Sequence, residues 1–412
     1  AAMQGRAALN GAWEPGPLAK ETSVEKRSVL ERIVSEPGTV AREVGDYAAA
    51  VESAERVYEA AYYAPYAVHA MMEPPAATAR VEGDRCEVWS ATQAPQWTAG
   101  EVAGALRIPP GNVAANVTLV GGAFGRKSKP DYAVEAALLA RKAGRPVKVL
   151  FTREDEIRHA FYHPESYQLL RATLDGEGNP TGWMHRSAFP AIGWTFPDGG
   201  AIPTGQERQL GLTTMPYRFP NIQIEVGKVP SSVRIGWMRS VCNMFHACGV
   251  QCFMDELSHE LGRDPVEFHM AMLGAPRVMR LDGSDDETAY DEGSAPFPYD
   301  TGRLKAVGEA AADMAGWGRA LPDREGLGFA MHYSFYSYVA MVAHVSVGPE
   351  DELTVHRVDA ALDCGPVLNP DAVEAQMQGA IAMSLSVVKH GRISLRNGAV
   401  EQSNYHDYPV IR

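Results

Sequence analysis

The sequence predicts an α+β protein, because its mixture of separate strand runs and helices favours this class over an all-parallel sheet. A β–loop–α–β unit at residues 117–151 is the clearest single feature, and a long amphipathic helix at 247–261 is the second. The chain has 412 residues, of which 45% are hydrophobic, so two or three domains with ample cores are expected.

The first half of the chain provides the following elements in order. Residues 1–17 carry apolar positions at helical spacing without a start signal, and residues 18–47 are polar enough to form a linker or surface crossing. Two strands, 77–81 and 86–90, flank the turn Glu82-Gly83-Asp84. The central unit then consists of a strand at 117–120, a loop at 121–129, a helix at 131–143 closed by Gly144, and a strand at 147–151.

The second half combines strands with stronger helices. Residues 166–190 and 217–230 have strand patterns, the helix at 247–261 ends at Gly262, and Asp264-Pro265 begins another helix with an N-cap and a proline. A long exposed loop is expected at 275–300, followed by a helix at 302–315. Alternating patterns predict a hairpin of strands 338–347 and 353–362, and a last hairpin surrounds Asn397-Gly398.

Charge and composition exclude several classes of protein. The formal net charge is −13 and no block is rich in Lys and Arg, so a general nucleic-acid binder is excluded. No stretch reaches the ~20 apolar residues that span a bilayer, so direct membrane insertion is not expected, and the first residues lack a signal pattern. Five unevenly spaced cysteines do not make a disulfide framework and are expected to be reduced.

The most informative loop is Gly121-Gly122-Ala123-Phe124-Gly125, which continues as Arg126-Lys127-Ser128 between a strand and a helix. Glycines let the backbone approach a ligand closely, and a helix N-terminus favours negative charge, so an oxyanion or phosphate site is one interpretation. The other is a tight structural turn. The spacing is neither that of a P-loop nor G-x-G-x-x-G.

Three further stretches carry polar groups that suit a ligand. Gln93 follows a strand and offers an amide to a polar edge, Arg239 precedes the helix at 247–261 and suits an anion, and Gln376 lies beside small residues on a helix. Each also has an ordinary interpretation, as a turn residue, a solvated arginine or a packing residue. His159 and His163 lack the pattern of a zinc site, and Cys242, His246, Cys248 and Cys252 are interpreted as a cluster with buried, inert thiols.

Taken in this order, the segments resemble the molybdenum-binding large subunit of the xanthine oxidase family, in particular the branch of isoquinoline 1-oxidoreductase beta subunits and aldehyde dehydrogenases. The matching segments are 69–96, VGGAFGRKSKPDY within 120–164, GWMRSV within 236–273, NPDAVEAQMQG within 358–386, and 404–410. The resemblance implies mixed sheets and helices like those of the molybdenum-binding domains in such proteins. It also implies that the chain is a central portion of a large subunit, with a tail and linker at 1–50, a first cofactor-binding domain at 51–230 and a second, truncated one at 231–412.

The resemblance also implies a cofactor and residue roles. The cofactor is a molybdenum pyranopterin, as the cytosine dinucleotide, whose metal is held by the pterin and not by protein ligands. Gln93 and Phe124 take catalytic positions near the metal, and Trp237 and Val241 form the substrate pocket. The cofactor-binding set is Gln93, Gly121, Gly122, Phe124, Gly125, Arg239, Ser240 and Gln376. The implied reaction oxidises an electron-poor carbon of an N-heteroaromatic or aldehyde, with water as the oxygen source.

Electrons are then expected to leave through 2Fe-2S clusters in a small partner subunit, and a cytochrome is a further candidate acceptor. The family's Gly-Gln-Gly loop and its late Gly-x-Gly-Glu segment, which carries the general-base glutamate, are absent from this sequence, and neither Glu309 nor Glu177 fits that role. The expected compartment is the periplasm or the inner-membrane surface, with the cytoplasm as the alternative. The alternative functions are a degenerate, non-catalytic scaffold and an enzyme that binds a nucleotide phosphate at the Gly121–Gly125 loop.

Overall fold

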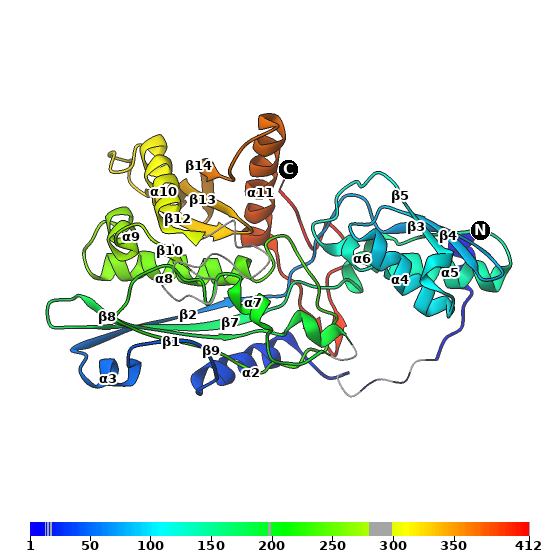
Figure 1. Cartoon of the computed structure of the whole chain (residues 1–412), viewed down its shortest axis with the longest axis horizontal. Coiled ribbons are helices and arrows are strands. Elements are labelled where there is room, and N and C mark those ends of the chain that lie inside the picture. Colours follow the sequence, from blue (N-terminus) through cyan, green and yellow to red (C-terminus); the bar gives the residue numbers. More distant parts are fainter. Residues whose placement is uncertain (13, 15, 17–18, 197–198, 280–298, 412) are drawn as a thin grey trace.

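The computed structural model describes the chain except residues 13, 15, 17–18, 197–198, 280–298 and 412. It confirms an α+β fold built from several sheets, of which the two largest combine parallel and antiparallel pairs (Figure 1). The helices are α1 Ala2–Ala7, α2 Ser23–Ser35, α3 Tyr47–Glu52, α4 Pro95–Leu106, α5 Asp131–Ala143, α6 Arg153–Arg158, α7 Gly205–Gln209, α8 Asn243–Glu260, α9 Pro265–Leu273, α10 Thr301–Ala315 and α11 Pro370–His390. The longer strands are β1 Thr39–Val44, β2 Arg56–Ala64, β3 Ala76–Glu82, β4 Arg85–Ser90, β5 Val113–Val117, β6 Val147–Leu150, β7 Ser166–Leu174, β8 Pro180–Ala188, β9 Asn221–Val226, β12 Glu325–Ser334, β13 Ser337–Val347 and β14 Leu353–Asp363.

A five-stranded sheet in the order β1-β9-β8-β7-β2 forms the base of the molecule. The β8–β9 pair is parallel and the other pairs are antiparallel. Helix α8 covers one face of this sheet, and α2 and α3 lie against the other (Figure 1). Because both faces are covered, strand β7 is buried along almost its whole length.

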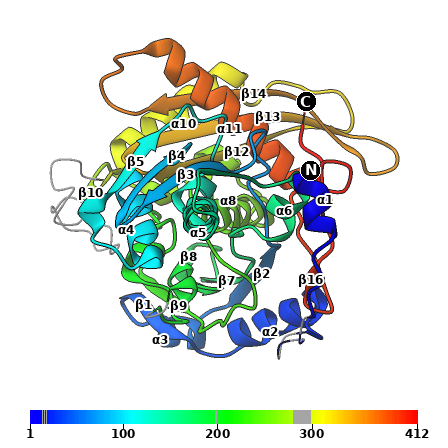
Figure 2. The same cartoon turned by 90° about the vertical axis from the view of Figure 1, so that its right-hand side faces the viewer.

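A smaller unit at one end of the molecule consists of the sheet β5-β4-β3-β6 with helices α4 and α5 packed on it (Figures 1 and 2). Its core is separate from the main one and is rich in alanine, since α5 presents Tyr132, Ala133, Ala136, Ala137 and Ala140 to the sheet. Small side chains bring the helix close to the strands, which fixes the position of the loop at 121–130 that leads into α5.

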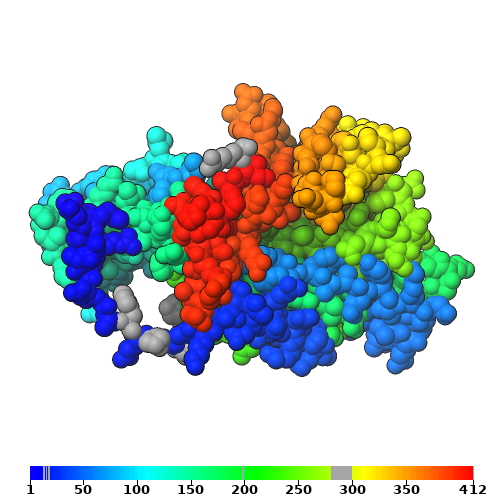
Figure 3. Space-filling model, turned by 180° about the vertical axis from the view of Figure 1, so that it is seen from behind, coloured from blue at the N-terminus to red at the C-terminus, as the bar shows by residue number. Residues whose placement is uncertain are grey.

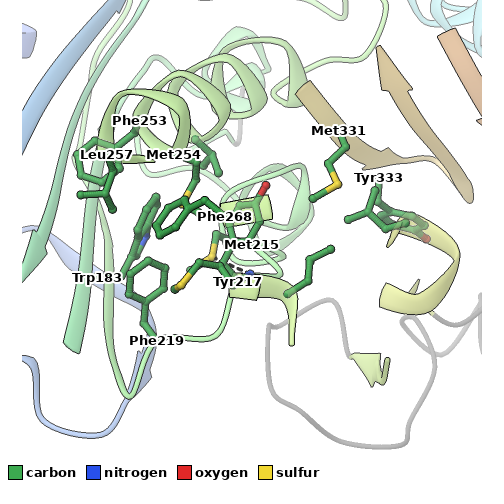
Figure 4. Packing of buried hydrophobic residues seen from close by; sticks show 14 of the residues in the cluster. Trp183, Met215, Tyr217, Phe219, Phe253, Met254, Leu257, Phe268, Met331 and Tyr333 are labelled. Carbon is green, nitrogen blue, oxygen red and sulfur yellow. Dashed lines mark hydrogen bonds between the residues drawn. The ribbon is translucent and has the colours of Figure 1, made fainter. Parts of the chain in front are cut away.

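The main hydrophobic core joins the large sheet, α8, α9 and the meander β12-β13-β14 with its helix α10. Trp183 lies against Phe219 and Phe253, and the cluster continues through Phe268 to Met331 (Figure 4). This single core contains residues from both sides of position 230. The division of the chain at 50 and 230 stays a prediction.

Helix α11 and the C-terminal segment complete the described chain. Helix α11 lies between the meander and the small unit, and none of its 21 residues is buried (Figure 1). After it, the short hairpin of β15 Leu395–Arg396 and β16 Ala399–Val400 follows, and the chain to residue 411 crosses the surface beside the small unit (Figure 3). Within the described parts, no helix has the length and apolar character to cross a membrane.

Most predicted elements agree with the structure, and three expectations differ. The helix at 131–143, the helix after Asp264 and both hairpins are confirmed. Residues 18–47 instead contain α2 and β1, and the strand expected at 117–120 is wrong because β5 ends at Val117 and Leu119 is 95% exposed. The interpretation of Cys248 and Cys252 as buried is also wrong, because both lie on the exposed side of α8.

Two further expectations concern the loop at 275–300 and the cysteines. Part of the loop expected at 275–300, residues 280–298, lies outside the described residues, and its two ends pair as β10 Val278–Met279 and β11 Tyr299–Asp300. All five cysteines are free, namely Cys86, Cys242, Cys248, Cys252 and Cys364.

Candidate functional site

The glycine loop between β5 and α5 has a backbone conformation that requires glycine. Gly122 and Gly125 have φ angles of +91° and +104°, and Phe124 between them is also left-handed at +53°. An ideal Cβ at Gly125 would lie only 2.7 Å from the carbonyl carbon of Trp237 and closer still to its oxygen. The loop therefore packs its backbone directly against the segment 236–241.

A chain of hydrogen bonds brings the four predicted segments together. The Gly125 N–H donates to Gln93 Oε1 at 3.0 Å, and the Arg239 N–H donates to the carbonyl of Phe124 at 2.9 Å. The Arg239 guanidinium then donates to Gln376, to its carbonyl oxygen at 3.0 Å and to its Oε1 at 3.1 Å. The turn before α4, the glycine loop, the segment before α8 and helix α11 thus meet at one place.

The loop keeps its own charged side chains beneath it. The Arg126 guanidinium is buried and donates to Glu156 at 3.0 Å and to Asp131 at 2.9 Å. Buried Lys127 forms an ion pair with Glu73. Desolvation opposes ionisation of Glu73, but the Lys127 ammonium and the Gly121 N–H outweigh it and lower the pKa of this carboxyl.

The outer side of the loop offers backbone donors instead. Among the described residues, the N–H groups of Gly122, Ala123 and Phe124 find no acceptor, and Ala123 is buried. The Ser240 hydroxyl, in a residue with φ of +71°, has no hydrogen-bond partner in the same described part of the chain. Unpaired donors at a glycine-rich turn suit an oxygen-rich ligand.

Arg239 is the cation on this side of the loop. Its neighbour Gln376 is neutral, and no carboxylate of the described chain lies within ion-pair distance of it. Partial burial lowers the pKa of Arg239 from its usual value, and no acidic group of the described chain counters that effect. A half-buried guanidinium without a counter-ion is suited to bind an anion such as a phosphate.

Three cavities surround the segment 236–241. The largest has a volume of about 590 Å³ and includes Trp237, Val241, Phe196, Leu210 and Tyr333 in its lining. A second, of about 350 Å³, lies between the glycine loop and α11, and a third, of about 280 Å³, is lined by Arg239, Ser240 and α11. The loop and the arginine therefore face α11, while Trp237 and Val241 face an apolar cavity.

The structure thus gathers the predicted cofactor set around the glycine loop and places Trp237 and Val241 in the wall of the largest cavity. Gly121 and Gly122 line the second cavity with Phe124. The sequence did not indicate His69, whose Nε2 lies 2.6 Å from the Trp237 carbonyl, or Phe335 at the cavity lining. The aromatic pair just before the predicted strand at 338–347 was the sequence signal that could have indicated Phe335.

His163 and His246, which the sequence does not indicate as metal ligands, have structural roles. His163 is buried, with Nε2 3.0 Å from the Val241 carbonyl, and burial lowers its pKa to about 4. His246 is buried between Ser187 and the Leu210 carbonyl. Among the described residues, no three His, Cys, Asp or Glu side chains are grouped so that they could hold a metal ion.

Comparison with known proteins shows the family of the chain. The model of the molybdopterin cofactor-binding domain matches residues 33–273, and a second model of the same description matches residues 290–412. The chain is 30% identical to the beta subunit of an isoquinoline 1-oxidoreductase from Brevundimonas diminuta, over 88% of this chain and 43% of that protein. It is 27% identical to one subunit of a nicotinate dehydrogenase from Pseudomonas putida, over 89% of this chain and 31% of that protein.

The fold has matching solved structures. Quinoline 2-oxidoreductase from Pseudomonas putida 86 superposes with a TM-score of 0.65 at 16% identity, covering 91% of this chain and 70% of the other. A Cu,Mo-CO dehydrogenase superposes equally well, at 12% identity, with 90% and 69% covered. The chain spans about a third to a half of the length of the two relatives from Brevundimonas and Pseudomonas that it matches by sequence.

Proposed function

This chain belongs to the molybdopterin cofactor-binding family of the xanthine oxidase type, and from that premise we propose that it is the cofactor-holding part of a molybdenum hydroxylase. The proposed reaction oxidises an electron-poor carbon of an N-heteroaromatic or an aldehyde, with water as the oxygen source. The observation that carries the proposal is the meeting of Gln93, Phe124, Arg239 and Gln376 through one chain of hydrogen bonds.

The residues at this place fit a pyranopterin. Unpaired N–H groups at 122–124 and the Ser240 hydroxyl match its oxygen- and nitrogen-rich edges, and Arg239 matches a phosphate. The absence of a cluster of protein metal ligands among the described residues is compatible with a metal held by the pterin's sulfur atoms. When bound, this group supplies a two-electron redox centre at which oxygen derived from water is passed to carbon.

The chain's own residues then bind and orient. The Oε1 of Gln93 accepts from Gly125, which fixes the amide and leaves its NH₂ group to donate to an oxygen of the cofactor. The exposed ring of Phe124 covers one side of the site. Trp237 and Val241 present an apolar wall that excludes water from a flat substrate.

The general base comes, in this proposal, from outside the chain. Glu207 is the carboxylate that lines the largest cavity within the described residues. Its oxygens accept from the Ile192 N–H at 2.7 Å and from the Thr204 N–H and hydroxyl at 2.8 Å. Because its two oxygens already accept these three hydrogen bonds, the Glu207 carboxylate is held in the cavity wall as a structural group and not as the base.

We further propose the cytosine dinucleotide form of the cofactor, since Arg239 suits a second phosphate. The electrons are proposed to pass to 2Fe-2S clusters in a small partner subunit, with a cytochrome as a further acceptor. The compartment stays a prediction, with the periplasm or the inner-membrane surface first and the cytoplasm second. One similar protein, from Gluconacetobacter polyoxogenes, carries the name membrane-bound aldehyde dehydrogenase (pyrroloquinoline-quinone).

Molybdenum and pterin analysis of the native complex tests the proposal. We expect about one of each per chain, and a several-fold loss of both in Arg239→Met, because the cation that faces α11 at the loop is removed. Arg80→Met, which removes an exposed arginine of β3, is the control. Undiminished molybdenum in Arg239→Met would contradict the assignment, and a bound nucleoside triphosphate without molybdenum would favour the nucleotide-binding alternative.

Gln93→Ala tests the catalytic position separately. We expect turnover to fall by about a hundredfold, the cost typical of losing a hydrogen-bond donor to a reacting oxygen, while the fold is retained. Gln96→Ala, at an exposed glutamine in the first turn of α4, should leave turnover unchanged. Equal kinetics in the two variants would show that Gln93 is only a turn residue.

A further inference from the structure

Lys129 lies at the centre of an aromatic cage just after the glycine loop. Its Nζ is 3.6 Å from the ring centroid of Phe196 and 4.7 Å from that of Trp237. The rings of Phe161 and Trp97 complete the cage at 5.2 Å and 5.3 Å. All four distances lie within the range over which an ammonium is attracted to the face of an aromatic ring.

Charge, and not hydrogen bonding, dominates this environment. Lys129 is 5% exposed, and within the described residues its Nζ has neither a hydrogen-bond acceptor nor an ion-pair partner. Desolvation lowers the pKa of Lys129 to about 8. The charged groups that face it are Glu101 and Asp131, which favour the ammonium, and Arg126 and Arg234, which oppose it.

The cage connects the cofactor loop with the largest cavity. Phe196 and Trp237 both line that cavity. The Trp237 carbonyl is the group against which Gly125 packs, and it also contacts His69. Trp97 stands at the start of α4, just after Gln93, and its indole N–H is fixed by Glu101 at 2.8 Å.

We propose that Lys129 is a positioning residue whose ammonium holds the rings of Phe196 and Trp237 as the wall of the 590 Å³ cavity and thereby sets its affinity for flat aromatic compounds. The inference rests on the proposed function for one point only, that this cavity receives the substrate. A lysine that only filled space would be replaceable by an apolar side chain of similar length, because its contacts would be independent of charge.

The first experiment follows tryptophan fluorescence of the wild-type chain between pH 6.5 and 10. Loss of the ammonium should change the emission of Trp97 and Trp237, so we expect a transition with a midpoint near pH 8. The transition should be absent in Lys129→Met, which carries no charge, and in Lys129→Arg, which keeps its charge throughout this range. A transition of equal size in all three proteins would overturn the proposal.

The second experiment measures the affinity of the chain for quinoline, a neutral flat probe, at pH 7 and pH 9.5. The wild type should bind about tenfold more weakly at pH 9.5, Lys129→Met should be equally weak at both values, and Lys129→Arg should retain tight binding at both. Arg27→Met removes another cation from a ring, that of Tyr63 at 4.8 Å, and should bind like the wild type.

Either of two results would refute the inference: no quinoline binding by the wild-type chain, or binding that does not change with pH. The wild-type measurements need no variant to fold, so they decide the question even if Lys129→Met is unstable. Quinoline binding needs no cofactor. A failed molybdenum analysis would therefore reject the proposed function and leave this result standing.

Discussion

Gly125→Ala should disrupt the site more than any other single methyl group added to the loop. At φ of +104° an L-residue is strained, which costs roughly 1–2 kcal/mol. The new Cβ would also lie 2.7 Å from the Trp237 carbonyl carbon, so one of the two backbones must move. Displacing a packed backbone adds roughly 1–3 kcal/mol, and the expected total loss of unfolding free energy is about 2–5 kcal/mol.

Gly83→Ala is the matched control, because the turn between β3 and β4 also has a positive φ, of +59°, but its added Cβ would meet no atom within 4 Å. It should lose only the backbone part, about 1 kcal/mol. Denaturant unfolding gives the free-energy difference, and hydrogen exchange at the Gly125 amide reports the bond to Gln93. If the two variants lose equal stability, the close approach to Trp237 is not what fixes the loop.

Three other outcomes follow from particular contacts. Phe335→Asn should stabilise the chain by about 1 kcal/mol, since asparagine suits the left-handed φ of +46° in the two-residue turn between β12 and β13. It should also weaken quinoline binding, because a ring is lost from the cavity wall; unchanged thermal stability would contradict backbone strain at Phe335. Arg126→Met leaves Glu156 buried without its partner, so the free energy of unfolding measured with denaturant should fall by about 3–5 kcal/mol. The exposed control Arg80→Met should lose under about 1 kcal/mol, and similar losses in the two variants would show that the buried pair is unimportant. Burial lowers the pKa values of four histidines to about 3–4, namely His69, His163, His246 and His269. Because they stay neutral in the folded chain while the unfolded chain takes up protons, the free energy of unfolding should be full above pH 6.5 and fall toward pH 4, and a flat profile would refute this.

Local signals in the sequence were sufficient for the elements that carry strong boundaries. Helix α5 begins after Pro130 and ends at Gly144, and α9 begins with Asp264 accepting from the Glu267 N–H. Helix α2 was missed because its polar composition hides a narrow buried stripe. The reciprocal capping of Thr22 and Glu25 was the signal that could have revealed it.

The strand predicted at 117–120 was wrong because the apolar character of this run indicated a strand that does not form. Its residues have strand propensity, but β5 pairs in parallel with β4 and ends where the chain turns toward the glycine loop. Propensity describes what a residue tolerates, whereas pairing depends on a partner strand that local sequence does not specify. The same limit applies to Cys248 and Cys252, whose helical spacing matched the apolar face but whose side of α8 is exposed.

The local sequence could not predict which residues lie close together in the site. Arg239 and Gln376 are 137 positions apart and meet only because α11 lies beside the segment before α8. The ordered resemblance to a family supplied that pairing, while spacing alone left each residue with an ordinary interpretation. The Lys129 cage draws single rings from four separate segments, and nothing in the local sequence around any of them indicates the others.

The distribution of charge around the loop explains why it can serve an anionic, oxygen-rich ligand although three basic residues follow the glycines. Arg126 and Lys127 turn inward to carboxylates and Lys129 turns into aromatic rings, so none of the three presents its charge to the ligand side. That side keeps backbone N–H groups and Arg239. Backbone dipoles are fixed by the fold and need no reorganisation when a ligand binds, whereas flexible ammonium groups do. The inward charges thus serve the site by holding its backbone rigid.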